Sequence, residues 1–569
     1  MSAIFAVLCQ GAPLGDGDLQ RVLAAVRPGL SPWTSEGQVY HRRLPGGFLV
    51  STRPIEGRDF VYSGALSEAA LATLADLDPR QTEKELERID GEFAWVKVCP
   101  TSGRAAIARD RFGVCPLYWA RLDQNVVVSS SLTALSSVSG VSRQLDDSSV
   151  LDFLISGMQR RTEATIFRDI WRFPPAFYAT VDSDQVRLAR YWQLPIEEPL
   201  WSLTAQQCRE QLLERLDRAV TRQACPQHTG LMLSGGLDSA LIAASLTGHL
   251  GPRQLSRKTT AFTLGYHGDR EVQLAALSAS TLGLAHLVTL DDFQARPGGE
   301  ARRSTPQPDP EPYRAAQQKI NRAVQEQNIS VVLMGEDGDA LFRPPTVLEL
   351  LLSAGPIRTA VEAIRNARHP WRQRPDLGLR RQLRRSALTP APTPPFPRWI
   401  RPEAPTLDSA LARWESAWQD PVVHPWRPRS YADLTDSAAL GNFFESLSPE
   451  WTGTPTTYKL PLFDLDLVQW ALRLPPWPWC LDKRLLREIL RPILPSAIVD
   501  RGKTGFTVAS SQWSPAPEIL EALHPGLNRW VDLAGIRKEK NNLMHDDSLE
   551  VRYRILGLSR WMKDIEGAR

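Results

Sequence analysis

Apolar residues in the first third of the chain occur in short runs that are separated by Gly, Pro and Asp. Runs of this kind, some of them alternating with polar residues, occupy positions 2–8, 46–52, 59–64, 91–98, 104–110, 125–131 and 176–182. Short runs bounded by turn-forming residues are typical of β-strands. The pattern therefore predicts that residues 1–195 form a layered, β-rich domain with a few helices.

A different pattern begins at residue 205. Residues 191–204 contain two prolines and show no periodicity, which predicts a linker. Beyond it, helical periodicity at 205–220, 239–246, 271–283 and 313–327 alternates with short apolar runs at 229–233, 259–266, 285–290 and 329–335. Strands that alternate with helices predict a parallel, doubly wound sheet, so we expect an α/β domain over residues 205–569.

Residues 343–450 are less regular, and we expect them to form a variable helical region that contacts the substrate. Arginine is frequent from 358 to 401, and the proline-rich stretch 389–397 is expected to be extended. Solvated helix faces are the simpler explanation of the arginines. Packing in a core is the simpler role for the tryptophans of this region, which are otherwise candidates for shaping a substrate cavity: Trp371, Trp399, Trp414, Trp418 and Trp426.

Composition narrows the class of protein. A chain of 569 residues is long enough for at least two domains. Its net charge of +3, from 67 basic and 64 acidic residues, gives no case for binding nucleic acid. The six cysteines are scattered without metal-type spacing, which indicates reduced thiols and a cytoplasmic protein. We expect no signal peptide and no transmembrane segment, because no apolar run is long enough.

The stretch SGGLDS at 234–239 joins a predicted buried strand to a predicted helix. Gly235 and Gly236 lack Cβ atoms, so backbone N–H groups there can approach an anion closely. The helix amino terminus favours negative charge, Ser234 and Ser239 offer hydroxyl donors, and Asp238 can bind Mg²⁺. No lysine follows the glycines, so the common ATP loop that ends in Gly-Lys-Ser/Thr does not apply.

This stretch resembles the pyrophosphate loop (PP-loop) of the ATP pyrophosphatases, which cleave ATP between its α- and β-phosphates. Residues 91–98, 108–120, 126–135, 331–342, 458–475 and 483–506 resemble further segments of the class B asparagine synthetases. The resemblance implies an Ntn-hydrolase-like αββα domain of the glutaminase type over 1–195. A PP-loop synthetase domain over 205–569 would follow, with ATP and Mg²⁺ as cofactors.

The resemblance also implies roles for individual residues. Asp238 and Asp339 would hold Mg²⁺ and pyrophosphate, and Lys483 and Lys503 would stabilise charge that develops during catalysis. The catalytic residues would be Lys503, Lys483 and Asp238. An exposed helix position for Lys483 and a helix cap for Asp339 are the alternatives. The ATP-binding set would comprise Leu233, Ser234, Gly235, Gly236, Asp238, Ser239, Leu264, Gly335 and Glu336.

The amino-terminal region departs from this family. Class B asparagine synthetases begin with a cysteine whose thiol attacks glutamine, whereas Met1 is followed here by Ser2. Cys9 lies nearby, but it is expected to be a buried strand thiol. The stretch 59–71 also lacks the family's glutamine-holding patterns. We therefore expect a degenerate first domain without glutaminase activity, and an amine that comes from another source.

Two branches of the family activate a carboxylate for attack by an amine of the same substrate. β-Lactam synthetases use a Tyr–Glu pair, which would fall at Glu336 and near Thr457 and is absent here. Lasso peptide cyclases use a peptide α-amine, whose pKa of about 7.7–8.0 demands little help from a base. The sequence therefore favours a lasso cyclase that adenylates an Asp or Glu side chain of a precursor peptide, with a leader peptidase and a leader-binding protein as partners. A β-lactam-type synthetase, an ammonia-dependent asparagine synthetase and an inactive scaffold remain as alternatives.

Overall fold

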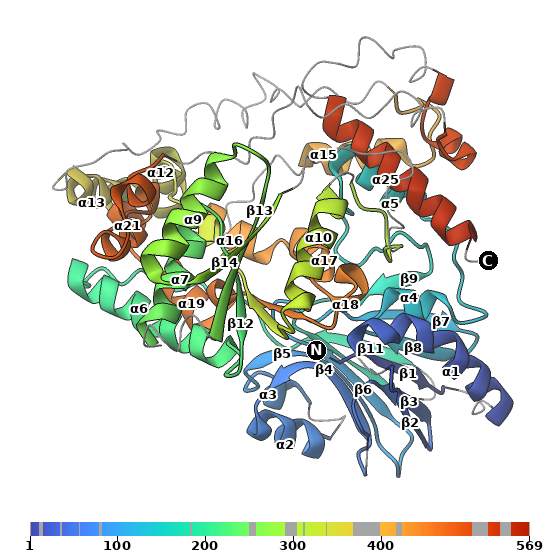
Figure 1. The fold of residues 1–569 in the computed structure, drawn as a ribbon. Helices are drawn as coiled ribbons and strands as arrows, with labels where there is room; N and C mark the ends of the chain where they lie inside the picture. The colour runs from blue at the N-terminus through green and yellow to red at the C-terminus, as the bar shows by residue number, and fades with distance from the viewer. Residues whose placement is uncertain are drawn as a thin grey trace.

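The chain folds into an antiparallel β-sandwich domain followed by a domain built on a parallel sheet (Figure 1). The structure is a computed structural model. It describes residues 2–10, 15–34, 37–55, 57–78, 82–182, 185–249, 258–290, 304–310, 313–336, 338–367, 399–416, 424–502, 522–534 and 548–567. Within these ranges no helix is long and apolar enough to cross a membrane.

Two antiparallel sheets form the first domain. The six-stranded sheet has the order β2-β3-β1-β8-β7-β9, and the five-stranded sheet has the order β11-β10-β6-β5-β4. The strands are β1 (Ile4–Leu8), β2 (Tyr40–Leu44), β3 (Gly47–Ser51), β4 (Phe60–Leu66), β5 (Gly91–Val98), β6 (Ala105–Arg109), β7 (Tyr118–Leu122), β8 (Asn125–Ser129), β9 (Ile170–Arg172), β10 (Phe177–Val181) and β11 (Val186–Arg190).

Alternation along the strands produces the layers. On β1, Ile4 and Ala6 point into the core between the two sheets, whereas Phe5 and Val7 point outward to the helices. Helices α1 (Asp16–Leu30), α4 (Leu132–Ser136) and α5 (Asp147–Ser156) cover that outer face. Helix α2 (Glu68–Asp76) and the short α3 (Thr82–Leu86) pack on the second sheet. The expected αββα order is confirmed.

The stretch 108–120 is a turn that two buried charged residues hold in shape. The Arg109 guanidinium donates to the carbonyl oxygens of Gly113 (2.7 Å) and Cys115 (2.8 Å). The Asp110 carboxylate accepts the N–H groups of Val114 (3.0 Å) and Cys115 (3.0 Å). Because the two charged groups bind several backbone groups of the turn, this family-like stretch has a structural role between β6 and β7.

A parallel sheet forms the centre of the second domain, as expected for an α/β fold. Its order is β14-β13-β12-β15-β16, with β12 (Thr229–Met232), β13 (Thr259–Gly265), β14 (Ala285–Leu290), β15 (Val331–Leu333) and β16 (Thr457–Lys459). Along the chain, β12 comes first, and β13 and β14 follow on one side of it. β15 and then β16 lie on the other side of β12. The strand order therefore reverses between β12 and β15, where doubly wound sheets bind their ligands.

Helices cover both faces of this sheet (Figure 1). Helices α6 (Ala205–Gln223), α7 (Leu237–His249) and α9 (Arg270–Leu282) pack on one face, and α10 (Tyr313–Glu326) packs on the other. The other α-helices of the described residues are α11 (Gly338–Leu341), α12 (Val347–Ala354), α13 (Pro356–Ala367), α15 (Leu407–Ser416), α16 (Pro428–Thr435), α17 (Ser437–Ser446), α18 (Pro449–Thr452), α19 (Leu465–Leu472), α20 (Pro476–Trp479), α21 (Arg484–Leu490), α22 (Ser496–Val499) and α25 (Ser548–Gly567).

Region 343–450 contains a helix with an inverted arrangement of polar residues. On α13, Ile357 is 79% exposed and Ile364 is 58% exposed, whereas Glu362 is fully buried and accepts the backbone N–H of Trp477. An amphipathic helix of a globular protein usually buries its apolar stripe. The apolar side chains Ile357 and Ile364 of α13 therefore point away from the core.

Buried polar contacts join the two domains. Arg172 of β9 and Glu445 of α17 form an ion pair in which both side chains are 1% exposed and the shorter distance is 2.6 Å. Glu450 of α18 accepts hydrogen bonds from the Ser131 hydroxyl (2.8 Å) and from backbone N–H groups at the start of α4. Carboxylates buried this deeply require these partners, so the relative position of the domains is well specified.

The Glu450 contact predicts a pH dependence of stability. Burial raises the pKa of Glu450 to about 7, although its hydrogen bonds favour the ionised form. An unfolded glutamate titrates near about 4.3. Between these values the folded protein holds a proton that the unfolded chain has lost, so stability falls as pH rises, by at most about 1.4 kcal/mol per pH unit.

Glu450→Gln is expected to remove this slope and to destabilise the protein by about 1–3 kcal/mol, because its amide N–H₂ would face other donors. Urea denaturation of both proteins between about pH 5 and about pH 7 measures the slope. An equal slope in both proteins would contradict the assignment to Glu450.

Candidate active site

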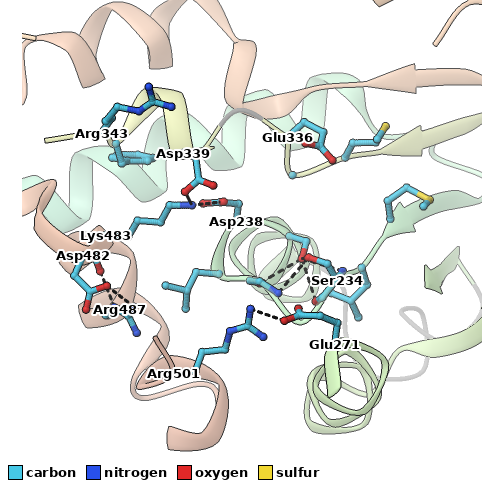
Figure 2. Close-up of a pocket in the computed structure, with 18 of the residues that line it drawn as sticks. Ser234, Asp238, Glu271, Glu336, Asp339, Arg343, Asp482, Lys483, Arg487 and Arg501 are labelled. Carbon is cyan, nitrogen blue, oxygen red and sulfur yellow. Dashed lines mark hydrogen bonds and ion pairs between the residues drawn. The ribbon is translucent and has the colours of Figure 1, made fainter. Parts of the chain in front are cut away.

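A cavity of about 590 Å³ lies at the carboxyl ends of β12, β13 and β15, at the point where the strand order reverses (Figure 2). Ten of the residues singled out in the sequence line it: Leu233, Ser234, Gly236, Asp238, Ser239, Leu264, Gly335, Glu336, Asp339 and Lys483. These residues come from the end of β13, from the segments that follow β12 and β15, and from the turn that precedes α21. The fold therefore brings into one cavity residues that lie up to 250 positions apart in the sequence, from Leu233 to Lys483.

The loop between β12 and α7 is closed by its two serines. The hydroxyl groups of Ser234 and Ser239 lie 3.0 Å apart, and the Ser234 hydroxyl accepts the N–H of Gly236 at 3.1 Å. The first residues of α7, Leu237 to Ser239, line the cavity. The amino terminus of a 13-residue helix therefore faces the cavity, an arrangement that favours a bound anion.

The second loop packs so closely on the first that glycine is required. A Cβ atom on Gly335 would lie 2.5 Å from the backbone nitrogen of Ser239. A Cβ atom on Gly338 would lie 2.3 Å from the carboxyl carbon of Asp238. Both distances are shorter than a Cβ contact allows, so these glycines set the separation of the two loops.

Gly338→Ala is therefore expected to displace the Asp238 carboxylate. We expect the affinity for MgATP to fall by about 10-fold or more, since the loss of a contact that orients a metal ligand has effects of that order. Titration calorimetry measures the affinity. The matched control is Gly441→Ala, because a Cβ atom there would meet nothing within 4 Å. Unchanged affinity in Gly338→Ala would contradict the close packing.

Lys483 links the carboxylates of the two loops. Its ammonium group forms ion pairs with Asp238 and, at 2.7 Å, with Asp339. Its side chain is 17% exposed, so it is not an exposed helix residue. Both Asp482 and Lys483 have φ of +49°, a conformation that costs about 1–3 kcal/mol per residue outside glycine. Asp482 is held by Arg487 at 2.8 Å, which stabilises the strained turn that directs Lys483 into the cavity.

The Asp238 and Asp339 carboxylates suit a magnesium ion. They converge on one cation, the Lys483 ammonium, and carboxylate oxygens are the ligands that Mg²⁺ prefers. Among the described residues, no group of three or more His, Cys, Asp or Glu could hold a metal ion alone. Protein Mg²⁺ sites that contain one or two carboxylates are usually completed by substrate phosphates and water. The donor set therefore fits an ion that arrives with a nucleotide.

Glu336 is the third carboxyl group of the cavity. Burial raises its pKa, the charges of Asp238 and Asp339 raise it further, and Lys483 opposes them. A carboxylate whose pKa is shifted toward neutrality is suited to accept a proton during a reaction.

Several predicted residues lie outside this arrangement. Lys503 falls outside the described residues, as do Trp371 and Trp418. Gly235 is not among the residues that line the cavity. A Cβ atom there would lie 2.7 Å from Glu271 of α9 and 2.9 Å from Arg501. Thr457 is buried at the amino end of β16, whereas the cavity lies at the carboxyl ends of the strands. Of the three described tryptophans of region 343–450, none lines the cavity: Trp399, Trp414 and Trp426 pack in hydrophobic clusters.

The sequence reasoning missed other residues of the cavity wall, among them Glu271, Gln317, Phe342, Arg343, Arg487 and Arg501. Arg343 forms an ion pair with Asp433 (2.7 Å), and Arg501 forms one with Glu271 (2.7 Å). Arg501 stands in the family-like stretch 483–506, two positions before Lys503. Arg487 stands in the same stretch, and Phe342 ends the family-like stretch 331–342. Their place in these stretches is the signal that identifies the three residues, whereas Glu271, Gln317 and Arg343 are brought to the cavity by tertiary contacts.

Fold and site together define an enzyme of the ATP-dependent carbon–nitrogen ligases that join an amidotransferase-type domain to a PP-loop domain. The asparagine synthase family model matches residues 211–556, and a glutamine amidotransferase domain model matches residues 72–192. The chain belongs to the asparagine synthase family. Members of this family use ATP together with Mg²⁺.

Curated relatives are similar over different lengths. A putative glutamine-hydrolysing asparagine synthetase of Mycobacterium bovis is 26% identical over 77% of this chain and 70% of its own length. Asparagine synthetase 3 of Bacillus subtilis is 27% identical over 29% of this chain and 26% of its own length. Among solved structures, the glutamine phosphoribosylpyrophosphate amidotransferase of B. subtilis covers 58% of this chain and 81% of its own. Its sequence is 9% identical to this chain, and the TM-score of the comparison is 0.24.

Proposed function

We propose that the protein is a lasso peptide cyclase. The carboxylate of an Asp or Glu side chain in a precursor peptide attacks the α-phosphorus of ATP, the bond between the α- and β-phosphates breaks, and pyrophosphate leaves. The peptide's own N-terminal amine then attacks the acyl-adenylate. The new amide closes a macrolactam ring, AMP leaves, and the amine releases one proton.

The observation that carries this proposal is the burial of Ser2, which lies two residues before β1. Ser2 is 1% exposed, and its hydroxyl donates to the carbonyl oxygen of Tyr62 at 2.7 Å. A buried hydroxyl that is engaged in this way is poorly placed to attack glutamine. Cys9 follows the other end of β1, roughly 20 Å away along an extended strand, so it does not replace Ser2. The first domain is therefore not expected to supply ammonia from glutamine, and we propose that the amine belongs to the substrate.

The cavity has the groups that adenylation needs. The loop at 234–239 and the amino terminus of α7 receive the phosphates, and Asp238 and Asp339 would hold Mg²⁺. A bound Mg²⁺ would neutralise phosphate charge. Lys483 lies beside both carboxylates, where a fixed ammonium can stabilise charge that develops on the reacting groups. Lys503 is the second candidate for that role, by its place two residues after Arg501.

An α-amine suits the acid–base groups of the cavity. It is a much stronger base than the amide nitrogen that a β-lactam synthetase activates, and its pKa of about 7.7–8.0 leaves a reactive fraction near neutrality. Glu336, whose pKa is raised by burial, would accept the remaining proton in this proposal. The Tyr–Glu pair of β-lactam synthetases has no counterpart at Glu336 and Thr457.

One alternative has support of its own. The curated relatives are named as asparagine synthetases, which favours an enzyme that activates aspartate and accepts ammonia. A further set of partners follows only from the cyclase proposal. It comprises a precursor peptide as substrate, a leader peptidase and a leader-binding protein.

The deciding experiment supplies the protein with MgATP, a candidate precursor peptide and its leader peptidase. The expected products are AMP, pyrophosphate and a peptide that has lost one water and resists proteases. Mass spectrometry and digestion measure both properties. Formation of free asparagine from aspartate with ammonia or glutamine, and no cyclised peptide, would overturn the proposal.

Ser2→Ala separates the two domains functionally. If the first domain takes no part in the supply of ammonia, the variant should cyclise the peptide at the native rate, within about 2-fold. Neither protein should release glutamate from glutamine. A loss of glutamine-dependent product in the variant would show that Ser2 is a nucleophile.

A further inference from the structure

Two of the charged residues of the cavity form an ion pair that has no role in the mechanism above. Arg501 and Glu271 face each other below the phosphate loop (Figure 2), with 2.7 Å between Nη2 of the arginine and Oε1 of the glutamate. Their side chains are 13% and 23% exposed. Glu271 belongs to the first turn of α9, and Arg501 follows α22, so the ion pair joins two distant parts of the chain.

This ion pair lies directly against the phosphate loop. A Cβ atom on Gly235 would lie 2.9 Å from Nη1 of Arg501 and 2.7 Å from Oε2 of Glu271. One side of the guanidinium is therefore paired with Glu271, while its second terminal nitrogen approaches the first glycine of the loop. The absence of a side chain at Gly235 permits this approach.

Among the described residues that line the cavity, the other basic side chains are engaged elsewhere. Lys483 pairs with Asp238 and Asp339 on the opposite side of the loop (Figure 2). Arg487 donates to Asp482 and Arg343 pairs with Asp433. Arg501 is the arginine that the structure brings against the loop itself.

We infer that Arg501 binds phosphate oxygens of ATP on the loop at 234–239, with Glu271 as the residue that positions it. A guanidinium carries five N–H donors in a planar fork, so one edge can pair with a carboxylate while other donors reach a phosphate. This inference rests on the proposed function only in that ATP is the substrate. It adds a cation on the side of the loop opposite to Lys483.

The test uses the full chain and three probes: MgATP, magnesium pyrophosphate and adenosine, each titrated by calorimetry. Arg501→Ala is expected to weaken MgATP and pyrophosphate by about 10- to 100-fold, the range for a lost charge-assisted hydrogen bond. Adenosine binding should not change, because adenosine has no phosphate. Arg501→Lys keeps the charge and should restore part of the affinity.

Glu271→Gln tests the positioning role. It is expected to weaken both phosphate ligands by a few-fold and to leave adenosine binding unchanged, whereas Glu271→Asp, which keeps the carboxylate, should stay closer to the native affinity. The matched control is Arg491→Ala, which removes an arginine that pairs with Asp500 at 2.9 Å and does not line the cavity.

Two results would overturn the inference. One is that Arg501→Ala binds pyrophosphate and MgATP with the same affinity as the native protein. The other is an equal loss of adenosine binding, which would make the ion pair a structural support only. The proposed function fails separately: if the native protein binds pyrophosphate through Arg501 but forms no AMP with the peptide, the inference stands for the anion and the cyclase proposal falls. A native protein that binds neither phosphate probe refutes both.

Discussion

Asp238→Asn is expected to reduce ATP-dependent formation of AMP by at least about 100-fold, which is the order of effect for removing a group that stabilises charge in a transition state. Three observations place Asp238 at the centre of the site. It lies in the first turn of α7, and it shares the Lys483 ammonium with Asp339. Its carboxylate also occupies space that a side chain at Gly338 would fill. An amide keeps the shape but lacks the negative charge that a divalent cation and an ammonium require.

The measurement is the release of AMP and pyrophosphate in the presence of the peptide substrate, together with calorimetry for MgATP. Asp466→Asn is the matched control, because Asp466 is half exposed and pairs with Arg218 at 2.8 Å outside the cavity. Its activity should equal that of the native protein. Native activity in Asp238→Asn would show that the phosphate loop is assigned wrongly.

Removal of either partner of the Arg172–Glu445 pair is expected to destabilise the protein by about 3–5 kcal/mol, because the remaining charge would stay buried. The pair is surrounded by further contacts: Arg172 also donates to the carbonyl oxygen of Ala164 (2.5 Å), and Gln307 donates to Glu445 (3.1 Å). Glu445→Ala would leave the guanidinium at the domain interface without its carboxylate.

Urea denaturation of Arg172→Ala and Glu445→Ala measures this effect. The double variant Arg172→Met, Glu445→Leu should be more stable than either single variant, since apolar replacement of both charges removes the unpaired one. Arg168→Ala serves as the control, because Arg168 makes an exposed contact with Gln144 and should contribute less than about 1 kcal/mol. Single variants as stable as the control would contradict a specified domain interface.

Strands and helices with a clear period were predictable because burial on one face imposes that period. The apolar runs at 91–98 and 285–290 correspond to β5 and β14 residue for residue. Two edge strands were missed: β2 (YHRRL) and β11 (VRLAR) carry charged residues and pair on one side only. β16 has three residues, too few for any period to emerge. These strands exist because their neighbours supply hydrogen-bond partners, which local sequence does not encode.

Some residues of the candidate site could likewise be recognised in the sequence, and others could not. Ser234, Gly236, Asp238 and Ser239 were recognisable because one short stretch combines small residues, hydroxyls and a carboxylate at a strand–helix junction. Gln317 was not recognisable, because it reaches the cavity from the middle of α10 through packing on the sheet. Its type and spacing resemble those of any polar helix residue.

The sequence by itself determined the class of chemistry, since an anion loop after a buried strand requires only local residues, and it also determined the α/β order of elements. The tertiary structure decided what the loop faces. It placed Lys483 between Asp238 and Asp339, set Arg501 with Glu271 against Gly235, and buried the Ser2 hydroxyl. Such contacts join positions tens to hundreds of residues apart, and their geometry follows from packing and strand order.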